Sequence, residues 1–304
     1  MRPGTLYVVA TPIGNLADLS ERAREVLGAA DHILAEDTRR ARVLLSHIGV
    51  ATRPVSLHAH NEAARVALAR RWLRAGDDVA VISDAGTPLL SDPGERLVGA
   101  VIEMGGEVVP IPGPSAILAG LAVSGLPCVP FTFTGFPPRK AGRRARALER
   151  IIDATETTVL FESPSRLVGL LDELAARMRE SGSEGAGSGM SAAPRAVRRV
   201  AVCREMTKVH EEVFRGSAAE CAAHYREHPP RGEVTVVVEG RARRGGEATE
   251  AELEALAAEA LAEGLAPTAA AREVAVRSGV ARGVAYEAVQ RVRDGRRASE
   301  EGPE

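Results

Sequence analysis

Leu6-Tyr-Val-Val-Ala-Thr-Pro-Ile-Gly-Asn-Leu16 joins a short apolar run to a loop that contains proline and glycine. A second run, Val79–Ile82, ends in Ser83-Asp-Ala-Gly-Thr-Pro88, and a third, Val108–Ile111, ends in Pro112-Gly-Pro-Ser115. Short apolar runs that alternate with amphipathic stretches are typical of buried strands between helices. The chain is therefore predicted to be an α/β protein.

The same alternation continues along the chain and predicts two domains. Residues 1–127 contain strand candidates at Leu6–Ala10, Ile33–Glu36, Val55–Leu57, Val79–Ser83 and Glu107–Ile111, with helical patterns between them. Ser124-Gly-Leu-Pro-Cys-Val-Pro130 then interrupts any regular element, because proline and glycine disfavour both helix and strand interiors. Residues 128–242 contain further candidates at Phe131–Thr134, Thr157–Phe161, Val200–Arg204, Glu211–Phe214 and Val234–Glu239. We expect two α/β domains, 1–127 and 128–242.

Two further segments differ in composition from these domains. The glycine- and serine-rich residues 180–194 bury too little apolar surface to fold, so a flexible loop is expected inside the second domain. Residues 243–304 are rich in alanine and glutamate and predict a small helical appendage with a disordered tail. Within it, Pro267–Tyr286 resembles a helix-turn-helix with Gly279 in the turn, although a helical hairpin for packing or dimerisation fits the pattern equally.

Composition excludes several classes of protein. The 304 residues are 45% hydrophobic and 26% charged, the profile of a soluble globular protein with room for roughly two domains. The apolar runs are far shorter than the roughly 18 residues of a membrane helix, and no secretory signal opens the chain. A cytoplasmic protein with no membrane partner is therefore expected. A net charge of −2 with 3% aromatic residues argues against a base-stacking nucleic-acid surface but leaves room for a local basic patch.

The loops that follow three of the strand candidates form the first candidate site. Ligands of open α/β sheets bind beyond the carboxyl ends of the strands, where such loops lie. Proline fixes the backbone and glycine removes the side chain, so main-chain N–H and C=O groups can approach a ligand closely. None of the loops matches GxGxxG or GxxxxGK[ST] or offers a lysine or arginine, whereas Asp84 suits a positive charge. We expect one composite pocket for a neutral or cationic ligand.

Polar residues follow two other strand candidates, in Glu36-Asp-Thr-Arg39 and His58-Ala-His-Asn-Glu62. The candidate general bases or substrate contacts among them are Glu36, Asp37, His58 and Glu62. The alternative is that Asp37 and Asn61 simply cap the helices that follow. No metal site is expected, because His58 and His60 lack a third ligand at the usual spacing and the three cysteines of the chain are well separated.

The second half offers a basic run and two isolated carboxylates. Pro137-Pro-Arg-Lys-Ala-Gly-Arg-Arg-Ala-Arg146 suits a phosphate backbone, although a solvated helix face explains it equally. Glu162 lies where a strand candidate meets a helical pattern, at the edge of the expected crevice. Glu205 lies in a charged turn that is either a substrate contact or a solvated hairpin.

Seven motifs, in order along the chain, together resemble one family, the small-subunit rRNA 2′-O-methyltransferases of the tetrapyrrole methylase superfamily. They are Val9–Ser20, Glu36–Arg39, His58–Glu62, Ser83–Gly94, Pro112–Ser115, Phe161–Arg166 and Arg204–Lys208. The resemblance covers residues 5–240, and the helical tail resembles the family's C-terminal extension more loosely. The stretch at 180–194 looks like an insertion that lies away from every motif.

The resemblance implies two α/β domains with S-adenosylmethionine in the cleft between them, usually in a homodimer. The implied substrate is one cytidine ribose in the decoding region of small-subunit rRNA, as naked rRNA or within the assembled small ribosomal subunit. The expected cofactor-binding residues are Pro12, Gly14, Ser83, Asp84, Ala85, Gly86, Thr87, Pro88, Pro112, Gly113, Pro114, Ser115 and Phe161. The expected RNA-binding residues are Arg39, Arg139, Lys140, Arg143 and Arg144.

Two alternatives stay open at this point. A methyltransferase that acts on a tetrapyrrole precursor would share the pocket loops, but it would not need the basic run. A nucleic-acid-binding module without enzymatic activity would use the helix-turn-helix-like tail, but it leaves the three rigid loops unexplained. The sequence does not rank the four candidate bases.

Overall fold

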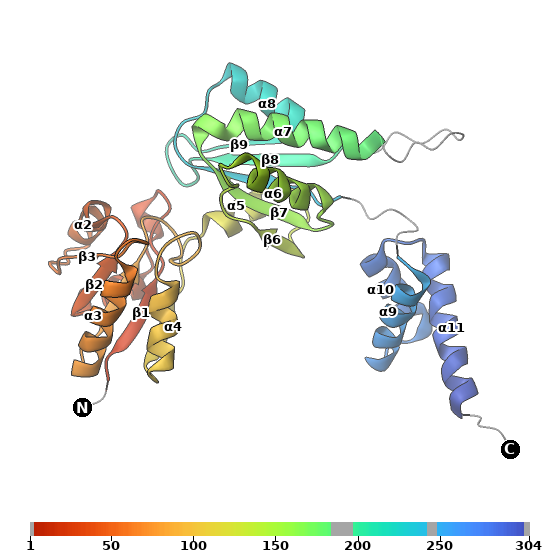
Figure 1. The fold of residues 1–304 in the computed structure, drawn as a ribbon, viewed down its shortest axis with the longest axis horizontal. Helices are drawn as coiled ribbons and strands as arrows, with labels where there is room; N and C mark the ends of the chain where they lie inside the picture. Colours follow the sequence, from red (N-terminus) through yellow and green to blue (C-terminus); the bar gives the residue numbers. More distant parts are fainter. Residues whose placement is uncertain (1–2, 184–196, 242–247, 301–304) are drawn as a thin grey trace. The chain divides into compact units, whose positions relative to one another are not determined.

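The computed structural model describes residues 3–183, 197–241 and 248–300, which form two compact units (Figure 1). Among the residues that the structure describes, the first unit, 1–239, contains two five-stranded sheets, and the second, 240–304, contains three helices. Most of the loop expected at 180–194 and the end of the expected tail, 301–304, lie outside the described residues. The domain boundary expected at 127 stays a prediction.

The first sheet is parallel throughout, with the order β3-β2-β4-β1-β5. Its strands are β1 (Thr5–Val9), β2 (His32–Ala35), β3 (Val55–Ser56), β4 (Val79–Ile82) and β5 (Glu107–Ile111). Val9 at the end of β1 pairs with Ile82 on one side and with Ile111 on the other. The carboxyl ends of the neighbouring strands β4, β1 and β5 are therefore level, and the loops that follow them start side by side.

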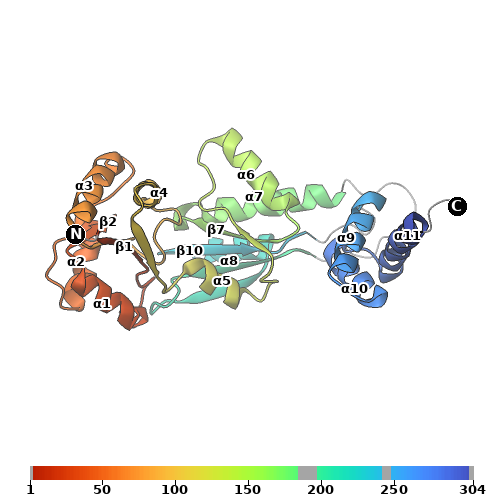
Figure 2. The ribbon, with the colours of Figure 1, turned by 90° about the horizontal axis from the view of Figure 1, so that it is seen from below.

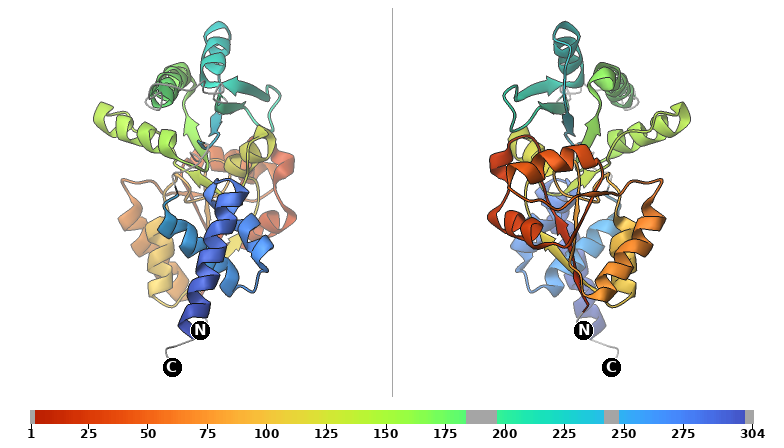
Figure 3. Two further views of the ribbon diagram at one scale, coloured as in Figure 1. Left: turned by 90° about the vertical axis from the view of Figure 1, so that its right-hand side faces the viewer. Right: turned by 90° about the vertical axis from the view of Figure 1, so that its left-hand side faces the viewer.

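Helices cover both faces of this sheet. Helices α1 (Glu21–Ala29) and α2 (Thr38–His47) lie on one face, and α3 (Glu62–Ala75) and α4 (Glu95–Glu103) lie on the other (Figure 3). Alternation along β4 supplies both cores: Ala80 and Ile82 pack against the first pair of helices, and Val79 and Val81 pack against the second. A strand buried on both faces reads as a continuous apolar run, which explains the sequence of β4.

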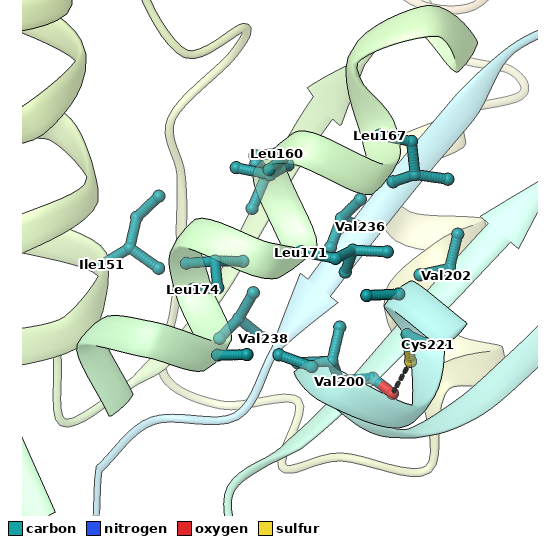
Figure 4. Packing of buried hydrophobic residues seen from close by; sticks show 14 of the residues in the cluster. Ile151, Leu160, Leu167, Leu171, Leu174, Val200, Val202, Cys221, Val236 and Val238 are labelled. Atoms are coloured by element: carbon teal, nitrogen blue, oxygen red, sulfur yellow. Dashed lines mark hydrogen bonds between the residues drawn. The ribbon is translucent and has the colours of Figure 1, made fainter. Parts of the chain in front are cut away.

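The second sheet is mixed, with the order β6-β7-β10-β8-β9. Its strands are β6 (Phe131–Phe133), β7 (Thr157–Glu162), β8 (Arg199–Arg204), β9 (Glu212–Ser217) and β10 (Val234–Val238). Only β6 and β7 run parallel, and the other neighbours are antiparallel. Helices α6 (Ala141–Asp153), α7 (Pro164–Ser183) and α8 (Ala218–Glu227) cover one face, where Leu167, Leu171 and Leu174 of α7 pack on the valines of β8 and β10 (Figure 4).

Helix α5 (Ala116–Ser124) covers the other face of the second sheet (Figure 2). Its Ile117 and Leu121 pack on Val159, Ala201 and Val237 of three strands. The helix follows directly on the loop that leaves β5 of the first sheet. This loop therefore links the two sheets, and its backbone is held at both ends.

The C-terminal unit is a small three-helix core of α9 (Glu250–Ala262), α10 (Pro267–Ser278) and α11 (Arg282–Glu300). Alanines dominate its buried positions and let the helices approach closely. The backbone of Gly279, with φ of 72°, ends α10 in the left-handed conformation. The predicted appendage is thus helical, with the glycine at the turn between α10 and α11. Among the described residues, no helix has the length and apolar character of a membrane span.

Candidate active site

The three proline- and glycine-containing loops meet at the carboxyl ends of β1, β4 and β5. Thr11 and Gly86 exchange two backbone hydrogen bonds, of 2.9 and 3.0 Å, which join the first loop to the second. Thr87 Oγ1 donates to the carbonyl oxygen of Pro114 at 3.5 Å and joins the second loop to the third. The loops thus form one cluster, at the end of a parallel sheet where ligands of such sheets bind.

Glycines permit this close approach of the backbones. The backbone of Gly86 has a φ of 77°, and a Cβ atom there would lie 3.3 Å from Ile13 Cγ2. A Cβ atom on Gly113 would lie 3.0 Å from Ala10 Cβ, closer than side chains ordinarily tolerate. The backbone of the cluster is therefore packed without intervening side chains.

Asp84 ties this cluster to the loop that follows β2. Its Oδ1 atom accepts a hydrogen bond from the backbone N–H of Asp37 at 2.9 Å, and its Oδ2 atom lies 3.6 Å from Arg40 Nε. The side chain is 27% exposed, so the carboxylate is still reachable from solvent. The cluster therefore presents a negative charge beside backbone carbonyl groups.

Glu36 and Asp92 form a hydrogen-bonded pair of carboxyl groups beside Asp84. Burial, followed by the charge of Glu36, raises the pKa of Asp92 to about 7. Burial, followed by the charge of Asp84, raises the pKa of Glu36, and the hydrogen bond with Asp92 opposes that rise. The two carboxyl groups therefore share one proton through their hydrogen bond, and the pair titrates near neutral pH.

Asp92 was not among the candidates that the sequence offered. It lies in the segment between β4 and α4, where Leu89 and Ser91 both have a φ of 76°. Left-handed backbone is costly for leucine in particular, by about 1–3 kcal/mol per residue, and is held only where the surroundings determine it. No sequence signal marks these conformations, so the approach of Asp92 to Glu36 is visible only in the fold.

Glu62 holds the end of the same segment. Its buried carboxylate accepts hydrogen bonds from the backbone N–H groups of Gly94 at 3.0 Å and Arg96 at 3.3 Å, at the start of α4. The Glu62 carboxylate thus caps the N-terminus of α4, although the two are more than 30 residues apart in the chain. In this structure Glu62 positions the Asp92 segment.

Asp37 has the capping role that the sequence left open. Its side chain accepts a hydrogen bond from the backbone N–H of Arg39 at 2.8 Å and pairs with the Arg39 guanidinium at 2.8 Å. These hydrogen bonds lower the pKa of Asp37 to about 2. A carboxylate with such a low pKa is a weak proton acceptor at neutral pH.

His58 and the residues after it lie at the surface. The backbone N–H of His58 donates to Asn61 Oδ1 at 2.8 Å, and the imidazole ring lies 6.1 Å from that of His60. The Asn61 side chain was offered as a cap of α3, but it makes no capping hydrogen bond and binds the loop before it instead. Within the described ranges, no group of three or more side chains is arranged to hold a metal ion.

The second sheet contributes the hairpin between β8 and β9 to the same region. Thr207 Oγ1 accepts a hydrogen bond from the backbone N–H of Asn15 at 3.0 Å, and Met206 packs on Ile13. A Cβ atom on Gly14 would lie 2.8 Å from Thr207 Oγ1 and closer still to the Lys208 side chain. The hairpin therefore closes directly against the loop after β1.

Glu205, the second isolated carboxylate of the sequence, lies in this hairpin. Its Oε1 atom accepts from Lys208 Nζ at 2.8 Å and from the backbone N–H of Glu233 at 2.9 Å. The carboxylate thus holds the hairpin together from within.

Phe161 is separated from the other expected cofactor residues by its position on β7 of the second sheet. Its ring packs on Phe133 and Phe136, with centroid distances of 4.9 and 5.5 Å. The remaining twelve expected cofactor residues all belong to the loops after β1, β4 and β5.

The expected RNA-binding residues fall into two kinds. Arg39, Arg139, Lys140 and Arg143 are exposed. Arg144 is only 14% exposed, and its Nε atom donates to Glu173 at 2.8 Å. Arg144 is thus held by Glu173, and Arg39 pairs with Asp37 at the surface, whereas Arg139, Lys140 and Arg143 are exposed.

Comparison with known proteins identifies relatives along most of the chain. The family model described as Tetrapyrrole (Corrin/Porphyrin) Methylases matches residues 5–222. A protein of Mesorhizobium japonicum named Ribosomal RNA small subunit methyltransferase I is 46% identical over 77% of this chain and 74% of its own. The protein of that name from Escherichia coli O157:H7 is 41% identical over 78% of each chain.

The fold is likewise found among solved structures. Uroporphyrin-III-C-methyltransferase of Thermus thermophilus superposes with a TM-score of 0.52 at 20% identity, over 77% of this chain and 94% of that one. This likeness confirms the predicted α/β architecture with two sheets.

Proposed function

Because the chain belongs to the tetrapyrrole methylase family, we propose that it transfers a methyl group from S-adenosylmethionine to small-subunit ribosomal RNA. The acceptor is the 2′-hydroxyl of one cytidine ribose in the decoding region. The proposed rRNA substrate is supported by the 41–46% sequence identity to proteins named Ribosomal RNA small subunit methyltransferase I, over more than three quarters of this chain. S-Adenosylmethionine is the methyl donor of the family.

The loop cluster suits this cofactor by its chemistry. S-Adenosylmethionine carries a sulfonium and an ammonium group, which are stabilised by carboxylate and carbonyl oxygens. The cluster combines the Asp84 carboxylate with backbone carbonyls, and the absence of side chains at Gly86 and Gly113 lets the three loops pack closely into one site. The loop residues Pro12–Gly14, Ser83–Pro88 and Pro112–Ser115 would hold the cofactor, with Phe161 reaching it from the second sheet.

The bound cofactor supplies an electrophilic methyl group, so the chain has to orient the ribose and accept its proton. Alignment of the 2′-hydroxyl by fixed contacts lowers the entropic part of the barrier. A general base contributes about 10²–10⁴-fold by removing the hydroxyl proton.

Glu36 is the best placed of the four candidate bases. Its raised pKa makes it a stronger proton acceptor than Asp37, whose pKa is about 2. Glu62 is occupied by backbone N–H groups, and His58 lies at the surface. We therefore assign proton acceptance to Glu36, whose pKa is raised by burial and by Asp84, with Asp92 as its hydrogen-bond partner.

A homodimer is part of this proposal. Apolar side chains stand exposed on the outer face of the second sheet region: Leu118 on α5 is 58% exposed and Val129 before β6 is 85% exposed. Adjacent Phe131, on the edge strand β6, is 36% exposed. Large apolar side chains that stand exposed are favoured candidates for a surface that a second copy covers.

The test is methyl transfer from labelled S-adenosylmethionine to small ribosomal subunits from a strain that lacks the modification. We expect 2′-O-methylcytidine at one decoding-region position, identified by mass spectrometry of the nucleosides. Failure to label either subunits or naked rRNA, with cofactor binding demonstrated by calorimetry, would refute the proposed substrate. Labelling of a tetrapyrrole precursor instead would favour the alternative activity.

A further inference from the structure

An open cavity of about 560 Å³, lined by several charged residues, lies at the start of α7, on residues distinct from the loop cluster at the end of the first sheet. Its lining residues are Arg139, Arg144, Ser163, Ser165, Arg166, Gly169 and Glu173. They come from the segment before α6, from α6 itself and from the first turns of α7. The cavity is thus a feature of the second sheet and its helices.

A buried carboxylate holds two of the arginines in place. The Glu162 side chain is fully buried, and its Oε1 atom accepts from Arg166 Nε at 2.7 Å and from the backbone N–H of Ser163 at 2.8 Å. Its Oε2 atom lies 3.5 Å from Arg144 Nη1. A buried charge is tolerated only when it is paired and hydrogen-bonded, so Glu162 and the two guanidiniums form a fixed unit.

The arginines keep hydrogen-bonding capacity toward the cavity. A guanidinium carries five N–H donors, and the carboxylates of Glu162 and Glu173 use only some of those of Arg144 and Arg166. Within the described part of the chain, Arg139 has no carboxylate partner and is exposed. Three guanidiniums against two carboxylates leave a net positive charge at the cavity.

We propose that this cavity binds a phosphate group of the RNA backbone. A guanidinium matches the geometry of phosphate oxygens, and one that a carboxylate already holds in place loses little side-chain entropy when it binds a phosphate. The hydroxyl group of Ser165, 3.5 Å from that of Ser163, supplies a further donor, and the positive end of the α7 dipole favours an anion at this place. The inference rests on the proposed RNA substrate and adds to it a binding point away from the methyl-transfer site.

Gly169 offers a clean test, because a Cβ atom there meets nothing within 4 Å and a helix interior favours any other ordinary residue over glycine. G169E places a carboxylate at the cavity, and G169Q places a neutral side chain of the same size there. Fluorescence anisotropy with a decoding-region rRNA fragment, over about 50–200 mM salt, measures the dissociation constant and its salt slope.

We expect G169E to raise the RNA dissociation constant about tenfold relative to G169Q, and to lower the salt slope by about one. Affinity for S-adenosylmethionine is expected to be unchanged in both variants. Equal RNA binding by the two variants would overturn the proposal. So would a loss of cofactor affinity in G169E with RNA binding intact, because the cavity would then serve the cofactor.

E173Q tests the same cavity in the opposite direction. It removes one of the two negative charges, while the glutamine amide oxygen can still accept from Arg144 Nε, so RNA binding is expected to tighten by about two- to threefold. Unchanged or weaker RNA binding by E173Q would contradict the assignment. Methyl transfer by the unmodified protein distinguishes failure of the proposed function from failure of the cavity assignment. If the unmodified protein methylates rRNA and the variants bind RNA as tightly as it does, only the cavity assignment is wrong.

Discussion

Glu36 and Asp92 show how much the chemistry of one side chain depends on its neighbours. Both are carboxyl groups that an isolated chain would ionise well below neutral pH. Burial and the charges of neighbouring carboxylates, Asp84 for Glu36 and Glu36 for Asp92, raise the pKa of each, whereas Asp37, next to Glu36 in the chain, has its pKa lowered by hydrogen bonds to Arg39. Adjacent residues thus differ in basicity because their side chains face different surroundings.

Replacement of Glu36 by glutamine is expected to lower kcat by about 10²–10⁴-fold, since the amide accepts no proton. Affinity for S-adenosylmethionine, measured by calorimetry, should change little. D37N is the matched control: it keeps a capping oxygen and is expected to retain most of the methyl-transfer rate. Full activity of E36Q would eliminate Glu36 as the base.

The Asp92 carboxyl predicts a pH dependence of both rate and stability. Its pKa is raised to about 7, so the folded protein binds this proton more tightly than the unfolded chain, and the stabilisation is lost as the pH rises toward about 7. D92N is therefore expected to raise stability at about pH 8 by about 1 kcal/mol, a figure reduced because the carboxyl is partly exposed.

The same variant should also change the rate profile. In the unmodified protein, kcat is expected to rise from about pH 6 to about pH 8 as the pair loses its shared proton. In D92N that rise should no longer be centred near pH 7, because the Asp92 carboxyl is absent and Glu36 titrates without it. Thermal unfolding and single-turnover methylation across this range measure the two effects, and an unchanged rate profile would show that the pair plays no part in proton acceptance.

At the scale of the element, α5 is the helix that the sequence patterns missed. Its sequence, Ala116–Ser124, is apolar on every side, so no amphipathic period marks it. One side packs on the second sheet through Ile117 and Leu121, and another side leaves Leu118 and Val123 exposed. Strand β9 also differs from prediction: it reaches Ser217 because its pairing with β8 continues to Arg199.

The exposed side of α5 predicts the position of the dimer interface. L118E places a charge on that side, and we expect it to convert a dimer to monomers in analytical ultracentrifugation. I102E is the matched control, because Ile102 on α4 is 60% exposed and lies on a different face of the first unit. Dimers that persist in L118E would place the interface elsewhere.

At the scale of the whole molecule, the division into units 1–239 and 240–304 predicts that the first is self-sufficient for cofactor binding. The loop cluster, the Glu36–Asp92 pair and the β8–β9 hairpin all lie within it. A chain that ends at residue 241 is expected to bind S-adenosylmethionine with an affinity within about twofold of the complete protein, by calorimetry. A loss of binding would mean that the C-terminal helices take part in the cofactor site.

Local pattern alone determined the α/β class, most strands and helices, and the three loops, because apolar periodicity and the backbone limits of proline and glycine act over a few residues. The sequence also named Glu36, although without ranking it above Asp37, His58 and Glu62. Only the tertiary structure brought Asp92 to Glu36, gave Glu62 the N–H groups of α4, and set Glu162 beneath two arginines. Burial and contacts between distant segments raise or lower the pKa of a carboxyl group and determine its hydrogen-bond partners. Such contacts do not appear in any local sequence pattern.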